Sequence, residues 1–111
     1  MTEHNEQMAL FQLLQNNEET KWLFAIPNGG QRDIRVAMNL KREGVKAGVW
    51  DLFLPLPRGR YHGLFIEMKF GNNKLSASQL AFGQYVVEQG YKAKVAYSCE
   101  EAYNIIQEYL K

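Results

Sequence analysis

The sequence has little of what builds disulfide-bonded, zinc-binding or membrane-spanning proteins. It contains one cysteine, Cys99, and two histidines, so it cannot form an internal disulfide and lacks the ligands of an ordinary structural zinc site. No apolar run approaches the roughly 20 residues that a membrane-spanning helix needs. The polar, acidic start, MTEHNEQ, is not that of a signal peptide. These absences predict a cytoplasmic protein without membrane association.

The sequence also lacks a strong excess of charge of either sign. The net charge is +1, so bulk electrostatics do not point to nucleic acid. The distribution is less even, because seven basic residues fall between positions 41 and 74 and most acidic residues lie elsewhere. That bias indicates either a face for a polyanion or ordinary solubilising charge, and both interpretations stay open.

The pattern of the chain predicts one α/β domain over residues 1–111, with 46% apolar residues to form its core. Amphipathic spacing predicts helices at 3–16, 33–43, 78–89 and 100–110. In the second of these we expect Ile34, Ala37 and Met38 to face inward. Apolar runs predict strands at 22–26, 49–55, 63–70 and 93–98. This order implies a small mixed sheet flanked by helices, in which the last strand runs parallel to the third.

The second and third strands are predicted to form a hairpin around the turn residues Pro55, Pro57 and Gly59. If the chain folds back near Gly59, facing residues have numbers that sum to 118, and Asp51 lies opposite Glu67. Cross-strand neighbours have Cβ atoms about 5 Å apart. Residues two apart on a strand share a face, so Lys69 joins the two carboxylates.

Two carboxylates in apolar surroundings repel each other and are costly to bury unless a cation accompanies them. Asp51 and Glu67 therefore predict a divalent metal site, and oxygen ligands at an open strand end suit Mg²⁺. The alternative is a solvated strand edge with an incidental Glu-Lys pair. Ser76 or Ser78 caps the following helix, which puts Gln79 in its first turn, from where it either reaches back toward the hairpin or faces solvent.

The arrangement resembles the PD-(D/E)xK nuclease core, and more closely its virus-type replication-repair branch, the VRR-Nuc domain of the stand-alone phage type. The residues that carry the resemblance are AIPNGGQR (25–32), GVKAGVWDL (44–52), GLFIEMK (63–69) and SASQ (76–79). The resemblance covers nearly the whole chain. One departure is visible, since Trp50 stands where the family usually has proline before the aspartate.

The resemblance implies a Mg²⁺- or Mn²⁺-dependent endonuclease that cuts DNA, plausibly branched or four-way junctions, inside a bacterial or phage-infected cell. Asp51, Glu67 and the backbone carbonyl of Met68 are the implied metal ligands. Lys69 is implied to orient the attacking water or stabilise developing charge, and Gln79 to hydrogen-bond that water or Lys69. An outer acidic ligand maps onto the first helix, either at Glu3 or at its competitor Glu6.

Four further residues are candidate contacts to DNA phosphates, although turn chemistry or a solvated surface explains them equally simply. They are Asn28 and Arg32 in a glycine-rich loop and Lys41 and Lys46 near the second helix. Rival classes are a non-catalytic DNA-binding module that retains the nuclease fold and a small interaction protein with a coincidental motif. Finally, apolar residues beyond the needs of a small core predict a homodimer, namely Trp22, Trp50, Phe70, Phe82 and several tyrosines.

Overall fold

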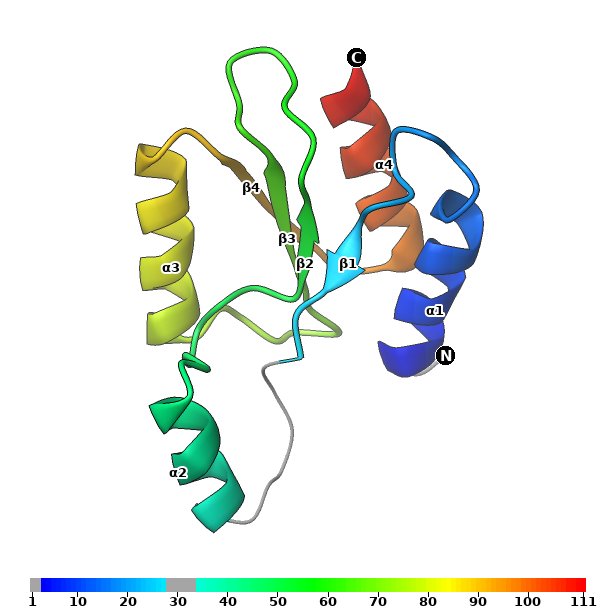
Figure 1. Cartoon of the computed structure of the whole chain (residues 1–111). Helices are drawn as coiled ribbons and strands as arrows, with labels where there is room; N and C mark the ends of the chain where they lie inside the picture. Colours follow the sequence, from blue (N-terminus) through cyan, green and yellow to red (C-terminus); the bar gives the residue numbers. More distant parts are fainter. Residues whose placement is uncertain (1–2, 28–33) are drawn as a thin grey trace.

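The computed structural model describes residues 3–27 and 34–111, except for the side chains of Glu3 and His4. The predicted order of helices and strands, α-β-α-β-β-α-β-α, is confirmed (Figure 1). The helices are α1 (Glu3–Leu14), α2 (Ile34–Arg42), α3 (Ala77–Glu88) and α4 (Cys99–Leu110). The strands are β1 (Phe24–Ala25), β2 (Leu52–Leu54), β3 (Leu64–Met68) and β4 (Lys92–Ala96).

The four strands form one mixed sheet in the order β1-β2-β3-β4. β2 and β3 are antiparallel, and their pairs Leu52 with Ile66 and Leu54 with Leu64 confirm the predicted register. β3 and β4 are parallel, as expected from the crossover through α3. All four strands are shorter than predicted, and β1 and β2 most of all in proportion, because β1 and β2 share only two residue pairs and β2 and β3 share three.

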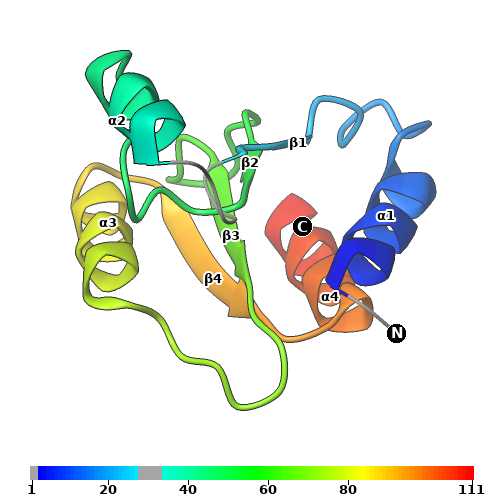
Figure 2. The same cartoon turned by 90° about the horizontal axis from the view of Figure 1, so that it is seen from below.

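Helices cover both faces of this sheet (Figure 2). α4 packs against β3 and β4 on one face, and α1 packs against α4. α3 packs against β4 from the opposite face. Successive residues along a strand point to opposite faces of the sheet. Alternation along β2 and β3 therefore decides which side chains lie on the α4 side and which lie on the α3 side.

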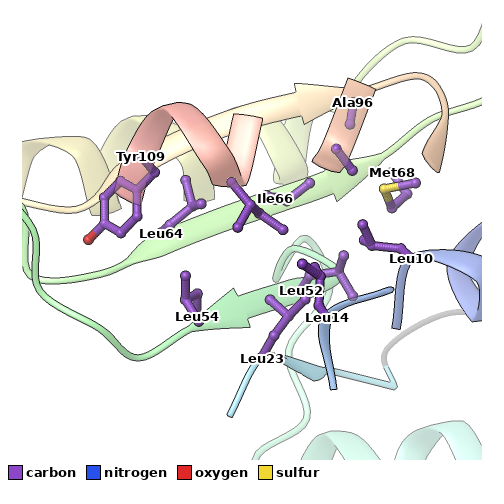
Figure 3. Close-up of a cluster of buried hydrophobic side chains, with 12 residues drawn as sticks. Leu10, Leu14, Leu23, Leu52, Leu54, Leu64, Ile66, Met68, Ala96 and Tyr109 are labelled. Atoms are coloured by element: carbon purple, nitrogen blue, oxygen red, sulfur yellow. The ribbon is translucent and has the colours of Figure 1, made fainter. Parts of the chain in front are cut away.

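The face toward α1 and α4 holds the aliphatic core of the domain (Figure 3). The sheet contributes alternate residues to this core, and Leu52, Leu64 and Ile66 are completely buried. Leu10 from α1 and Ile106 from α4 close it from the other side. Burying a side chain of this size contributes about 1.5–3 kcal/mol, so this layer supplies much of the free energy that holds the domain folded.

The opposite face of the sheet is aromatic. Phe53 and Phe65 are cross-strand partners whose rings stack with their centroids 4.3 Å apart. Phe82 from α3 meets the Phe65 ring edge-on, with a centroid distance of 5.2 Å. Glu67 lies two residues beyond Phe65, and Asp51 lies two residues before Phe53. The same alternation therefore places both carboxylates on this face.

At the turn end of the hairpin, two polar side chains bond a neutral or an oppositely charged partner. The Tyr109 hydroxyl donates a hydrogen bond of 2.6 Å to the carbonyl of Leu56. Arg58 and Tyr61 form an isolated antiparallel bridge, and the Arg58 guanidinium pairs with Glu19. These polar groups at the turn end are thus satisfied by a neutral or an oppositely charged partner.

The prediction that Ile34, Ala37 and Met38 face inward is wrong. Ile34 is 75% exposed, and α2 has no buried residue. No Cα of α2 lies within 8 Å of another helix or strand among the described residues, and Figure 1 shows the helix projecting below the sheet. The helix does end as predicted at Gly44, where the positive φ of 103° lets the Val45 N–H reach the carbonyl of Leu40. The apolar stripe of α2 is present as predicted, but it meets no other helix or strand among the described residues.

Within residues 3–27 and 34–111, no helix is long and apolar enough to cross a membrane.

Candidate active site

Three elements meet at the open end of the hairpin, opposite its turn. β2 begins there, β3 ends there, and the first turn of α3 lies beside them at the lower end of the sheet in Figure 1. Asp51 immediately precedes β2, Glu67 lies near the end of β3, and Gln79 is the third residue of α3. Residues separated by as many as 28 positions are therefore brought to one point by the hairpin and the helix that follows it.

The two carboxylates are held by crossed hydrogen bonds between the strands. The Asp51 N–H donates to Oε1 of Glu67 at 3.1 Å, and the Met68 N–H donates to Oδ2 of Asp51 at 2.9 Å. Each carboxylate is thus fixed by the backbone of the strand opposite its own. The predicted juxtaposition of Asp51 and Glu67 is confirmed by these contacts.

Lys69 and Gln79 both reach the second oxygen of Glu67. The Lys69 ammonium lies 3.6 Å from Oε2, and the Gln79 side-chain amide donates to the same oxygen at 3.0 Å. Lys69 is itself mostly buried, with 15% of its side chain exposed. Of the two alternatives for Gln79, the structure has the one in which the side chain reaches back to the hairpin.

Glu67 is a carboxylate in an unfavourable place, since only 3% of its surface is exposed. Burial, followed by the neighbouring charge of Asp51, raises the pKa of Glu67 to about 7, against the opposing influence of Lys69 and of the hydrogen bond from the Asp51 N–H. A carboxyl group whose ionised form is disfavoured in this way is typical of functional sites. A cation beside it would relieve both the repulsion and the loss of hydration.

The donor set fits a hard divalent cation. Asp51 and Glu67 supply two carboxylates. The Met68 carbonyl also faces this side, because a strand residue directs its N–H and C=O to the same edge and the Met68 N–H bonds Asp51. The described residues hold no cluster of three or more acidic, histidine or cysteine ligands. That composition matches Mg²⁺ sites, where one or two carboxylates bind the ion and water completes its coordination.

The first turn of α3 is fixed by a capping box at Ser76, one of the two predicted caps. The Gln79 N–H donates to Oγ of Ser76 at 3.2 Å, and the Ser76 N–H donates to Oε1 of Gln79 at 3.0 Å. The sequence signal for this arrangement is a serine followed three residues later by glutamine. Gln79 therefore caps its helix with its amide oxygen while its amide nitrogen holds Glu67.

Sequence reasoning missed the role of Trp50, which it counted among the spare apolar residues. Trp50 is 3% exposed, and its indole N–H donates to the carbonyl of Gln79 at 2.8 Å. It is therefore an internal contact between the start of β2 and α3. No periodicity marks such a contact, because it joins residues 29 positions apart.

Of the two acidic candidates on α1, Glu6 is engaged elsewhere. Its Oε2 accepts a hydrogen bond of 2.8 Å from the N–H of Cys99, the first residue of α4. Glu6 thus fastens α1 to the N-terminus of α4, where a negative charge is favoured by the helix dipole. The side chain of Glu3, like Asn28 and Arg32, lies outside the described residues.

Lys41 and Lys46 are both exposed, at the end of α2 and in the segment that leads from it to Asp51. Helix α2 lies at the same lower end of the molecule as the start of α3 (Figure 1). A hollow of about 430 Å³ lies between α1 and β1, and Gln7 and Phe24 are among the residues that line it. None of Asp51, Glu67, Lys69 and Gln79 lines it.

Comparison with known proteins identifies the family of this chain. The model of the VRR-NUC domain matches residues 3–100. A solved structure described as a VRR_NUC domain protein is 29% identical, with a TM-score of 0.85, and the match covers 99% of this chain and 88% of that one. No curated protein matches the chain. The small mixed sheet with its flanking helices accords with a restriction-endonuclease-like α/β fold. The chain belongs to the VRR-NUC domain family, a family of nucleases.

Proposed function

We propose that this protein is a structure-selective DNA endonuclease that hydrolyses phosphodiester bonds with the help of Mg²⁺ or Mn²⁺, acting on branched or four-way DNA. The observation that carries the proposal is the convergence of Asp51, Lys69 and Gln79 on the buried carboxylate of Glu67. DNA binding alone does not require two adjacent acids, which would repel phosphate. An acid pair with a lysine beside it is suited to hydrolysis.

Asp51, Glu67 and the Met68 carbonyl would hold the ion. When bound, a divalent ion lowers the pKa of a coordinated water and offsets charge that develops on phosphate oxygens. The Lys69 ammonium, held 3.6 Å from Glu67, donates hydrogen bonds to the attacking water or to a phosphate oxygen. Gln79 fixes the orientation of the Glu67 carboxylate. In this scheme Glu3 contributes from α1 as an outer ligand, directly or through water.

Substrate binding is proposed to rest on phosphate contacts. Lys41 and Lys46 are exposed cations at the end of α2 and in the segment that leads from it to Asp51, and Asn28 and Arg32 are proposed to join them. Phosphate contacts position a protein on DNA but carry no base identity. Cleavage should therefore depend on DNA structure and be indifferent to sequence, and affinity should fall steeply with salt because counterions are released on binding.

The working unit is proposed to be a homodimer, in which two active sites face the two-fold symmetry of a four-way junction. The support is α2, whose Ile34, Val36 and Met38 are 75%, 49% and 50% exposed. An isolated helix of nine residues is marginal in water, so its apolar stripe calls for a cover, and we assign that cover to a second copy of the chain. Trp22, 71% exposed, adds apolar surface, whereas the buried Trp50 does not.

Cleavage assays test the function directly. The protein is incubated with a four-way junction and with linear duplexes of the same strands, with Mn²⁺, with Mg²⁺ and with EDTA. We expect metal-dependent cuts on the junction at positions that do not share a base sequence. The matched control is Glu67→Gln, which keeps the shape of the side chain but removes its charge and replaces one of its two acceptor oxygens with a donor.

Each alternative has its own outcome in this assay. Junction binding without cuts under any metal condition would favour a non-catalytic DNA-binding module. Neither binding nor cuts would favour a protein that acts on other partners. Cut sites that converge on one base sequence would refute structure selectivity. For the dimer, light scattering at micromolar concentration should give twice the 12.8 kDa of the chain, and Met38→Glu should reduce that mass to one chain.

A further inference from the structure

The residue before the active-site aspartate does more than lead the chain into β2. The segment from Gly48 to Trp50 lies directly on the first turns of α3. Gly48 has a φ of +91°, and a Cβ there would lie 2.5 Å from the carbonyl oxygen of Ser78. Gly83 is similarly confined, since a Cβ there would lie 2.6 Å from Cζ2 of Trp50. Two glycines thus allow the segment and the helix to approach each other closely.

Within this contact the Trp50 indole makes a directional bond. Its N–H donates to the carbonyl of Gln79 at 2.8 Å, in a site where the ring is 3% exposed. The same Gln79 donates its side-chain amide to Oε2 of Glu67 at 3.0 Å. Trp50 is also covalently joined to Asp51, whose N–H bonds Oε1 of Glu67 at 3.1 Å. The two oxygens of Glu67 are therefore held by two groups that Trp50 connects.

We propose that Trp50 is a positioning residue for the active site, and this inference rests on the nuclease function proposed above. Trp50 touches neither substrate nor metal in this scheme. It fixes the distance between the start of β2 and the first turn of α3, so that Gln79 and Asp51 reach Glu67 together. Where proline stands before the aspartate, this indole N–H is absent. The chain thus uses a hydrogen bond from the preceding residue to lock its glutamine.

The main test compares Trp50→Phe with Tyr109→Phe. Each removes one hydrogen bond from an aromatic side chain to a backbone carbonyl, but Tyr109 bonds Leu56 at the opposite end of the hairpin. Trp50→Phe should lower kcat about tenfold with KM for the junction nearly unchanged, because small misplacements of reacting groups are costly. Tyr109→Phe should leave kcat unchanged. Equal loss of kcat in both variants would overturn the proposal, since it would reflect general destabilisation.

A double-mutant cycle separates positioning from other effects of Trp50. In a Gln79→Ala background Trp50→Phe should lower kcat by clearly less than tenfold, because the part of its effect that passes through Gln79 is already lost. A full tenfold loss in that background would overturn the proposal. Should Trp50→Phe fail to fold, Gly83→Ala replaces it. The added methyl group displaces the ring while keeping the indole N–H, and it should lower kcat in the same direction.

One readout needs no cleavage. In ¹⁵N-labelled protein with EDTA, Trp50→Phe should shift the Gln79 side-chain amide resonances, whereas Tyr109→Phe should leave them in place. Unchanged Gln79 resonances in Trp50→Phe would refute the positioning role. If those resonances shift but the wild-type protein cuts no DNA under any metal condition, the positioning contact stands and the proposed nuclease function fails.

Discussion

The two ends of the β2–β3 hairpin handle their polar groups in opposite ways. At the turn end, the Tyr109 hydroxyl bonds a carbonyl and Arg58 pairs with Glu19, so each of these polar groups has a neutral or oppositely charged partner. At the open end, Asp51 and Glu67 lie side by side, and Glu67 is buried with its pKa raised to about 7. The same two strands thus carry one end where these polar groups are matched and one end where two carboxylates lie together and Glu67 is buried. That local cost, at a place that holds a lysine and an amide as well, is typical of a site that binds a cation.

The largest expected difference between the ends is in cleavage. Asp51→Asn and Glu67→Gln should each reduce the cleavage rate by about a thousandfold or more, because each removes one of two charged ligands. Arg58→Ala at the turn end serves as the control and should cut as the wild type does. Retained activity in either purified acidic variant would contradict the metal assignment.

Lys69→Ala should separate binding from chemistry at the open end. The ammonium is proposed to act on water and phosphate, so its removal should lower kcat by about a hundredfold while Mn²⁺ still binds. Isothermal calorimetry measures the second quantity without any substrate. Lost Mn²⁺ affinity with normal turnover would reverse the assignment of roles.

The open end should also make stability depend on pH in the metal-free protein. The pKa of Glu67 is raised in the folded state from 4.5 to about 7, so folding favours its protonated form. The stabilisation from that proton is complete below pH 4.5 and is lost as the pH rises through 7. The free energy of unfolding in EDTA should fall over this range by about 2–3 kcal/mol.

Urea denaturation of wild type and Glu67→Gln between pH 4.5 and 8 measures this effect. The difference between the two proteins isolates Glu67 from other titrating groups, and the free energy of unfolding of Glu67→Gln should change less between pH 4.5 and 8 than that of the wild type. If the difference in the free energy of unfolding between the two proteins does not change with pH, the surroundings of Glu67 do not raise its pKa. Adding Mn²⁺ at pH 8 should restore stability to the wild type alone.

The smallest expected effects belong to the turn end. Tyr109→Phe should lower the free energy of unfolding by about 1 kcal/mol, the usual loss for one hydrogen bond. Arg58→Ala should change it by less than about 1 kcal/mol, because exposed ion pairs contribute little. Thermal denaturation detects both. A larger loss of unfolding free energy for either substitution would mean that the turn end depends on its individual polar contacts as strongly as the open end does.

Much of this contrast was predictable from the sequence. Turn residues around Gly59 and the alternation of apolar residues fix the register, and the register alone brings Asp51 to Glu67. The serine-to-glutamine spacing predicts the cap that carries Gln79 to the same point. These are local signals, and each constrains the backbone within a few residues.

What the sequence did not predict depends on contacts across the fold. The helical spacing of Ile34 and Met38 is correct, yet periodicity does not say whether an apolar stripe meets its own domain. The bond from Trp50 to Gln79 joins two elements that come together only after the sheet has formed. Glu6 similarly bonds the N-terminus of a helix that begins 93 positions later. Such pairings follow from tertiary packing, which composition and spacing leave open.

The capping box of α3 has a consequence for how this sequence can vary. Gln79 starts a helix with one end of its amide and holds Glu67 with the other. Glutamate at this position would keep the cap and lose the donor, and alanine would lose both. A saturation library at residue 79, sorted separately for folding and for cleavage, should yield two nested sets of tolerated residues. Glutamate should appear among the variants that fold but not among the variants that cleave DNA. Replacing glutamine with glutamate at this position therefore gives a protein that is folded but inactive.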